Sequence, residues 1–247
     1  MTDTYPKKLG KDPLVEVVFE VRLGAGPSSL SAVFPGVLKA KFKEQIKGIR
    51  QLPTFNIPKP VRDAQEGLRY QPSVQVEKEK FLIGISDCSV VLVCKEPYVG
   101  WSKFKEEITE IVRILKENTN QRVERFSLKY INFLEDSLIE RKLSSLNVQL
   151  NIAGRDINTE GNFIRVTNKE EQFLTIVTIA SDVKVNTKSS NGIIIDLDVI
   201  RQIDISMDVL SEDIECNIDL LHEEAKKKFF SLLKDGTLEK LEPDYEQ

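Results

Sequence analysis

The sequence predicts an α+β fold made of antiparallel strands and long amphipathic helices. Apolar and polar residues alternate in several runs, which is typical of strands that are buried on one face. Elsewhere apolar residues recur every three or four positions, which is typical of helices with one buried side. The chain has 247 residues, of which 40% are hydrophobic and 30% are charged. This composition is ordinary for a globular protein and would allow about 70–75% of the unfolded surface to be buried.

The first half of the chain contains four predicted strands and two predicted helices. Residues 14–23 alternate apolar and charged side chains and form the first strand. A helix is expected after Pro35, because apolar residues recur with helical spacing as far as Ile49. Four prolines make residues 51–72 a long loop. The remaining elements are strands at residues 73–79, 81–86 and 90–95 and a helix with Ser102 as its N-cap, which ends near Asn118.

The second half has more strands and one final helix. Residues 122–135 alternate in character and predict a strand, and residues 137–145 are expected to form a short helix. Polar clusters predict turns around residues 158–162, 168–171 and 186–191. The other predicted elements are strands at residues 147–153, 163–167, 173–185 and 192–206 and a helix at residues 217–234, with Gly236 as its C-cap.

Each half therefore consists of antiparallel strands followed by a long helix. This plan predicts two similar α+β lobes, residues 14–120 and 121–236, with a polar lead at residues 1–13 and a polar tail at residues 237–247. The same elements also fit one extended antiparallel sheet whose helices cover one face. A helix-grip fold, in which a long helix lies in a curved sheet, is a third arrangement that fits the pattern.

Charge and residue usage limit the functions that the chain can have. The formal charge is -4 and the isoelectric point is near 5.4, so no global field draws the chain onto nucleic acid or an anionic membrane. One histidine and three cysteines without CxxC spacing predict neither a zinc site nor a disulfide framework, and no cofactor is expected. No run approaches about 18 apolar residues, and the start has no signal-peptide core, so a cytoplasmic location is expected.

Aspartates in the last predicted strands are the candidates for metal chemistry. Asp196 and Asp198 are two residues apart in a strand, so both point to one face and could share a hard cation. A metal-dependent nuclease needs an acid on one strand and an acid-x-Lys triplet on the next, and Asp182 with Lys184 matches that triplet. Asp156 or Asp196 would be the distant acid. The alternative is the solvated face of an antiparallel strand, where the same alternation is ordinary.

A second group of candidates is basic and aromatic and would suit nucleic acid. Lysines on the exposed side of the helix predicted after Pro35 could follow a phosphate backbone. Phe55 and Tyr70, in the proline-rich loop, could stack on bases. The alternative is an ordinary solvated helix face. The basic candidates are Lys39, Lys41, Lys43, Lys47 and Arg50.

The single histidine, His222, lies in the helical sequence LLHEEAKKKFF. The letters HE match the start of a zinc-protease helix, but Lys226 stands where the second metal-binding histidine is needed, so no metal site is predicted there. His222 is expected either to pack beside Leu221 and bond a backbone group or to contact a partner.

Four stretches of sequence, taken together and in order, carry a resemblance. They are DPLVEVVFEVRL at residues 12–23, YVGW with Phe104, RFSLKYIN at residues 125–132 and LLHEEAKKKFF at residues 220–230. These landmarks resemble a sporadically distributed, uncharacterised prokaryotic protein family. Members of that family often lie among genes of mobile or defence islands, so the resemblance implies an accessory role in conflict with phages or plasmids. Lys129 stands where an arginine is expected and is a candidate partner contact.

The sequence therefore favours a non-catalytic cytoplasmic subunit or regulator of a prokaryotic multi-protein assembly, such as an antiphage or anti-plasmid defence complex. It would act by binding a protein encoded in the same operon, and the long strands at residues 173–185 and 192–206 would offer exposed edges to a partner strand. The alternatives are a nucleic-acid-binding module and a metal-dependent nuclease. Nucleic acid could also be bound through the protein partner.

Overall fold

The computed structural model describes residues 5–26, 29–139, 142–158, 161–170, 172–185, 188 and 190–245. Within these residues the chain has the predicted α+β fold, with a large antiparallel sheet and six α-helices. The chain packs into two compact units. The terminal unit contains the described residues up to 15, residues 129–199 and those from 222 onward, and the central unit contains residues 16–128 and 200–221.

Three long elements contribute residues to each unit. They are strand β7 (Val123–Glu135), strand β12 (Asn191–Ile205) and helix α5 (Met207–Leu232). The central unit thus takes residues 200–221 from the second half of the chain, and the division into residues 14–120 and 121–236 stays a prediction. The similarity of two lobes and the helix-grip arrangement stay predictions.

The strands of the central unit bear out the alternating pattern of the sequence. The first residues of β7 belong to this unit, and the strands that follow β7 in the hydrogen-bonded order are β2-β6-β5-β4-β3. The predicted strands at residues 14–23, 73–79, 81–86 and 90–95 are confirmed to within one residue at each end. The five strands of this order are β2 (Leu14–Leu23), β3 (Ile46–Gln51), β4 (Val74–Lys78), β5 (Phe81–Ile85) and β6 (Ser89–Lys95).

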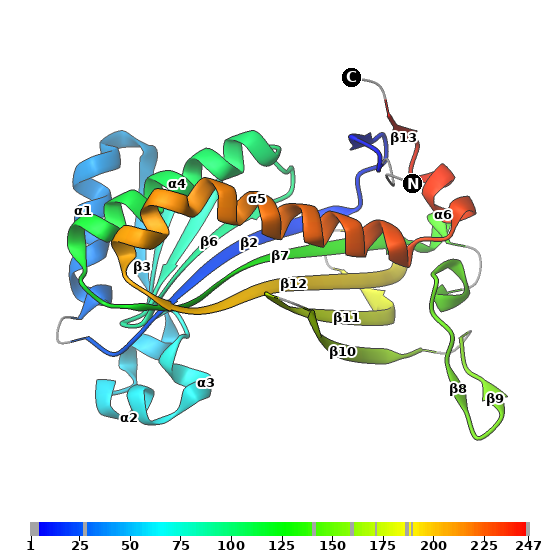
Figure 1. The fold of residues 1–247 in the computed structure, drawn as a ribbon, viewed down its shortest axis with the longest axis horizontal. Coiled ribbons are helices and arrows are strands. Elements are labelled where there is room, and N and C mark those ends of the chain that lie inside the picture. Colours follow the sequence, from blue (N-terminus) through cyan, green and yellow to red (C-terminus); the bar gives the residue numbers. More distant parts are fainter. Residues whose placement is uncertain are drawn as a thin grey trace. The chain divides into compact units, whose positions relative to one another are not determined.

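Two helices of the central unit, α1 (Leu30–Phe42) and α4 (Trp101–Asn118), lie beside these strands (Figure 1). The predicted stripe of α4 is confirmed, because all of its residues are buried. The helix begins directly after Gly100, whose φ of 90° suits glycine, so Ser102 lies inside the helix and is not its N-cap. The buried stripe consists of Phe104, Ile108, Ile111, Val112 and Leu115.

The helix predicted after Pro35 is wrong over its second half. Helix α1 already contains Pro35 and ends at Phe42, and Ile46–Gln51 forms strand β3. Lys43 ends the helix with a φ of 47°, and Gly48 is a weak helix former. Ile49 pairs with Val76 of β4 in the ladder, so pairing at the edge of the sheet overrides the helical spacing of the apolar residues.

The proline-rich segment after β3 is more regular than predicted. It contains the 3₁₀ turn η2 (Pro53–Asn56) and the short helices α2 (Lys59–Ala64) and α3 (Glu66–Arg69). Pro53 is the first residue of η2, and Pro60 is the second residue of α2. At these positions a helix needs no backbone N–H donor, so proline is tolerated there. These prolines therefore begin helical turns, so the segment predicted as a long loop contains short helices.

In the terminal unit the hydrogen-bonded order is β10-β11-β12-β7, where β10 is Phe163–Glu170 and β11 is Phe173–Lys184. The predicted long strands are confirmed, and β10 extends three residues further than expected. The prediction at residues 147–153 is mostly wrong, since only the short β8 (Asn151–Ile152) forms there and pairs with β9 (Arg155–Asp156). The remaining elements are β1 (Lys8–Leu9) paired with β13 (Pro243–Asp244), and the 3₁₀ turns η3 (Asp136–Leu138), η4 (Lys142–Ser145) and, in the central unit, η1 (Lys43–Gln45).

Helix α5 begins ten residues earlier than the helix predicted at residues 217–234. The Ser206 side chain accepts a hydrogen bond from the N–H of Val209 at 3.4 Å, which provides an N-cap that the sequence analysis missed. A further helix, α6 (Asp235–Lys240), follows, so Gly236 lies inside a helix and not at a C-cap. The buried side of α5 consists of Met207, Leu210, Ile214, Ile218, Leu221, Ala225 and Phe229.

Several predicted turns fall partly outside the described residues. The undescribed residues of these turns are 159–160, 171, 186–187 and 189. Residues 140–141 of the helix predicted at residues 137–145 are also outside the described part of the chain. Among the described helices, none combines the length and the apolar character that crossing a bilayer would require.

The burial of α4 can be tested by removing one ring. Phe104 is completely buried, so we expect Phe104→Ala to lower the free energy of unfolding by about 3–5 kcal/mol. Phe163 is 73% exposed and provides the matched control, since Phe163→Ala should change stability by less than about 0.5 kcal/mol. Urea unfolding followed by circular dichroism measures both values. Equal losses in the two variants would contradict the burial of α4.

Candidate functional site

The carboxylates proposed for metal binding lie in the terminal unit but do not come together. The side chain of Asp182, on β11, accepts a hydrogen bond at 3.1 Å from Asn191, at the start of β12. Asp196 is five residues further along β12, which is roughly 16 Å at the rise of a strand. Asp156 lies on the separate β8–β9 hairpin, and Lys184 is at the last position of β11.

The alternation predicted for β12 is confirmed. Ile195, Leu197 and Val199 are fully buried, and Asp196 on the opposite face forms an ion pair with Lys129 of β7 at 3.4 Å. Asp198, on the same face as Asp196, is largely buried. In the described part of the chain, no three His, Cys, Asp or Glu residues are grouped as a metal site would require. The geometry therefore fits a charged strand face better than a nuclease centre.

Lys129 and His222, the two candidate partner contacts, are on different faces of the sheet. The ion pair with Asp196 partly compensates the charge of Lys129. The Nδ1 atom of His222 lies 2.7 Å from the hydroxyl oxygen of Tyr130, and the two rings are in contact. Tyr130 follows Lys129 directly in β7, and successive strand residues point to opposite faces. His222 thus bonds a phenol, which the sequence analysis did not predict, and it lies on the opposite face of the sheet from Lys129.

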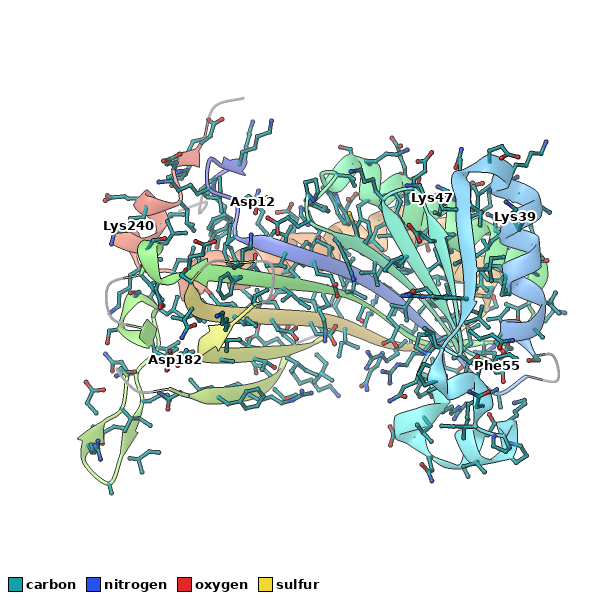
Figure 2. The ribbon with its side chains drawn as sticks, turned by 180° about the vertical axis from the view of Figure 1, so that it is seen from behind. Asp12, Lys39, Lys47, Phe55, Asp182 and Lys240 are labelled. Carbon is teal, nitrogen blue, oxygen red and sulfur yellow. The ribbon has the colours of Figure 1, made fainter. Side chains whose placement is uncertain are left out.

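The five basic candidates lie on three consecutive elements of the central unit and not on one helix as predicted. Lys39 and Lys41 are on α1, Lys43 is in η1, and Lys47 and Arg50 are on β3. Figure 2 shows Lys39 on α1, Lys47 on the neighbouring strand β3, and Phe55 beyond the far end of that strand. We call these five residues the basic surface.

The charges of the basic surface are not compensated by ion pairs, although Lys41, after Arg113, helps to lower the pKa of Glu110. Within the described residues none of its five cations forms an ion pair. Their contacts are to neutral groups: Lys39 donates to the carbonyl oxygens of Lys43 and Ile46, and Arg50 donates to the side-chain oxygen of Gln75 at 2.7 Å. Residues 30–51 contain five cations and one carboxylate, Glu44, which gives a net charge of +4. This surface is the main local departure from the acidic average of the chain.

The two aromatic residues proposed to stack on bases, Tyr70 and Phe55, differ in whether their rings are already packed against other residues. The guanidinium groups of Arg22 and Arg69 lie 4.3 and 5.2 Å from the centre of the Tyr70 ring. The Tyr70 hydroxyl donates to Glu124 at 2.7 Å, and burial together with this carboxylate raises the pKa of Tyr70 to about 12. Tyr70 therefore serves the packing of the central unit. Phe55, in η2, is exposed and remains available for contact.

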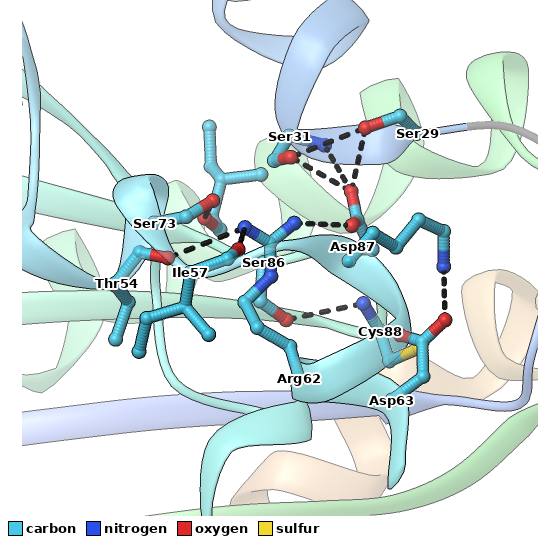
Figure 3. A network of polar contacts seen from close by, with 12 residues as sticks. Ser29, Ser31, Thr54, Ile57, Arg62, Asp63, Ser73, Ser86, Asp87 and Cys88 are labelled. Atoms are coloured by element: carbon cyan, nitrogen blue, oxygen red, sulfur yellow. Dashed lines mark hydrogen bonds and ion pairs between the residues drawn. The ribbon is translucent and has the colours of Figure 1, made fainter.

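A buried carboxylate, Asp87, fixes the start of α1, the helix that carries Lys39 and Lys41 of the basic surface (Figure 3). Its Oδ1 atom accepts hydrogen bonds at 2.7 Å from the hydroxyls of Ser29 and Ser31, at the N-terminal end of α1. Its Oδ2 atom accepts from Arg62 of α2 at 2.9 Å. One carboxylate thereby connects α1 and α2 to the turn between β5 and β6.

Hydrogen bonds decide the ionisation of Asp87. Burial by itself would raise the pKa of its carboxyl group, but the bonds from Ser31, Ser29 and Arg62 together hold that pKa below its ordinary value. Arg62 also donates to the carbonyl oxygens of Thr54 and Ile57, so the guanidinium group stays close to the carboxylate. The network is structural, since all of its donors and acceptors bond one another.

A second buried ion pair of the central unit escaped the sequence analysis. The Nζ atom of Lys78, on β4, lies 2.5 Å from Glu107 of α4, and their side chains are only 3% and 8% exposed. The Phe42 ring covers the ammonium group at 4.3 Å. Alternation offered a signal, because Lys78 is in phase with the buried Val74 and Val76. This pair joins sheet and helix and is closed to a ligand.

The free backbone edges of the sheet belong to β3 and β10, and not to the strands predicted at residues 173–185 and 192–206. Strand β11 lies between β10 and β12, and β12 lies between β11 and β7, so both are interior. Strand β10 is the longer edge, and it exposes Phe163 and Val166 at 73% and 53%. The prediction of exposed edges on these two long strands is therefore wrong, because strand order and not length decides exposure.

A comparison of the sequence with protein-family models and with curated proteins gives no match.

The Asp87 network predicts a pH-dependent loss of stability. At pH 7, Asp87→Asn should lower the free energy of unfolding by about 3 kcal/mol, because Arg62 then keeps a largely buried charge without a counter-charge. The folded-state pKa of Asp87 is lowered, so its contribution is present above the unfolded pKa and is lost as the pH falls through the folded value. The difference between wild type and variant should therefore shrink below about pH 4.

Urea unfolding at neutral pH and near pH 3 measures this difference. Asp63→Asn is the matched control, because Asp63 pairs with Lys59 at the exposed surface and should contribute less than about 1 kcal/mol. A loss in Asp87→Asn that is just as large in acid would contradict the role given to the ionised carboxylate.

Proposed function

We propose that the protein is a non-catalytic cytoplasmic subunit or regulator of a prokaryotic multi-protein assembly, such as an antiphage or anti-plasmid defence complex. It would act by binding a protein encoded in the same operon. The observation that supports this proposal is strand β10, an eight-residue edge strand that is exposed along nearly its whole length. The resemblance to a family found in mobile and defence islands supplies the setting.

An edge strand of this kind offers two sources of binding energy. The unpaired N–H and C=O groups along its outer side can form the same hydrogen bonds as another strand of the sheet. Exposed apolar side chains, here Phe163 and Val166, add area that a partner can bury. A protein that binds in this way needs no catalytic group.

Co-purification tests the proposal. We expect the tagged protein, expressed with its genomic neighbours, to elute with one neighbour in a fixed ratio, because the exposed edge gives a defined attachment point. The mass of the complex and its absorbance at about 260 and 280 nm identify the components. Expression with an unrelated operon of similar size is the control. A chain that elutes alone at monomer mass, without any neighbour, would refute the proposal.

The second candidate function is nucleic-acid binding, which the basic surface favours. Lysines and arginines without ion pairs can neutralise phosphates and release counterions. The surface has two cations on α1, one in η1 and two on β3, and Phe55 is an exposed aromatic side chain in the next turn. A metal-dependent nuclease is not proposed, because Asp182 of β11 lies beside Asn191, which is five residues away from Asp196 along β12.

Charge removal tests this second candidate. If the basic surface binds phosphates, Lys47→Gln with Arg50→Gln should weaken binding to RNA or DNA and lower the slope of log K against log salt by about 2. Lys103→Gln with Lys116→Gln changes the net charge equally, but these lysines already have carboxylate partners, so little change is expected. Fluorescence anisotropy with single-stranded RNA and duplex DNA measures both. Identical salt slopes in wild type and both variants would reject the basic surface as a phosphate site.

A further inference from the structure

The pairing of β10 with β11 shows which backbone groups of β10 are free. Residues 163–170 pair with residues 180–173 in one continuous register, without a bulge. At the start of this ladder the N–H of Ser181 donates to the carbonyl oxygen of Asn162 at 2.9 Å. In an antiparallel pair, backbone groups that face the partner recur at every second residue. The even-numbered residues of β10 therefore bond β11, and the odd-numbered residues direct their N–H and C=O groups outward.

The side chains of β10 differ between its two faces. Ile164 and Val166 lie on the face where Ile179 of β11 is buried, and Ile164 packs against the hydrophobic core of the terminal unit. The opposite face carries Phe163 and Thr167 together with two cations. These cations are Arg165 and Lys169.

The two cations of β10 are available to a partner. Within the described residues neither Arg165 nor Lys169 forms an ion pair. They are four residues apart on one face, which places them about 13 Å apart along the strand. A strand added next to β10 with the usual spacing would bring its own side chains within reach of both.

We propose that β10 accepts an extended segment of a partner protein in which acidic and apolar residues alternate. This inference rests on the proposed function and names the partner's chemistry. The acidic residues would lie beside Arg165 and Lys169, and the apolar residues would lie beside Ile164 and Val166. The outward C=O groups and the apolar side chains favour a peptide over nucleic acid, because a phosphate can accept from the N–H groups but can use neither the C=O groups nor the apolar side chains.

The other edge strand is less suited to the same role. Strand β3 has a register shift between Ile46 and Gly48, and only Ile49 and Gln51 lie beyond it with their backbone groups outward. A bulge and exposed lysines are devices that protect an edge from pairing with a further strand. Strand addition is therefore assigned to β10.

Synthetic peptides test the proposal directly on the full-length protein. The probe is a capped eight-residue peptide of alternating Glu and Val, and the control is the same peptide with Lys in place of Glu. We expect the Glu peptide to bind about tenfold more tightly than the Lys peptide in fluorescence anisotropy, because two cations face the added strand. Hydrogen exchange by NMR should slow at the amides of residues 163, 165, 167 and 169, and hardly change at residues 164, 166 and 168.

Substitutions separate backbone pairing from a general surface effect. Thr167→Pro removes one outward N–H and no bond to β11, so it should weaken peptide binding at least about tenfold. Thr167→Val keeps that N–H and should bind as the wild type does. Exchanging both charges, in Arg165→Glu with Lys169→Glu, should reverse the preference so that the Lys peptide binds more tightly. The charge exchange decides the question even if Thr167→Pro perturbs the fold.

Several outcomes would overturn the assignment. Equal binding of the two peptides, or binding without slower exchange at the outward amides, would show that β10 does not pair with an acidic strand. Competition by an oligonucleotide at the same amides would assign the edge to nucleic acid. Self-association that Thr167→Pro abolishes, without peptide binding, would assign it to a second copy of the chain.

The two proposals can fail separately. An operon-encoded partner that binds Thr167→Pro as tightly as wild type would leave the proposed function standing and remove β10 from it. A chain without any partner would refute the proposed function, while the peptide experiment would still decide the chemistry of β10.

Discussion

Backbone hydrogen bonding decides which strands of this protein are open to a partner. An interior strand has neighbours on both sides, so its N–H and C=O groups are used within the sheet. Strands β11 and β12 are long and partly apolar, yet both are interior. Strands β3 and β10 end the described sheet, and they keep one free edge each. Binding capacity therefore follows from the place of a strand in the order, and the same sequence placed one strand further in would have none.

Charge compensation separates the groups that hold the fold from the groups that remain for a partner. In the central unit Arg62 lies beside Asp87 and Lys78 beside Glu107, in surroundings where an unpaired charge would cost several kcal/mol. The cations of the basic surface and of β10 have no such partner among the described residues, and water solvates them instead. A solvated cation adds little to the free energy of unfolding, so stability does not account for these residues. An anionic partner would interact favourably with each of the two surfaces.

Local patterns could be predicted from the sequence, and distant relations could not. The alternation of β2 and the stripe of α4 were predictable because each depends on residues within one element. The Asp87 network joins residues up to 58 positions apart, so no local pattern signals it. The segment around Ile49 shows the reverse error: its spacing is helical, but pairing with β4 decides its structure. Lys39 and Lys41 therefore lie on a helix as predicted, whereas Lys43, Lys47 and Arg50 lie on a 3₁₀ turn and a strand.

The two edges of the sheet are protected in different ways, and this difference bears on selectivity. A register shift interrupts the pairing of β3 between Ile46 and Gly48, which shortens the regular edge that a further strand could use, whatever its charge. The register of β10 is continuous, and its protection consists of two cations on one face. A cation repels a basic strand but attracts an acidic one, so protection by charge is conditional where protection by geometry is not. An edge that is closed to most strands and open to one chemical class is what a regulator needs in order to remain unpaired until its partner is present.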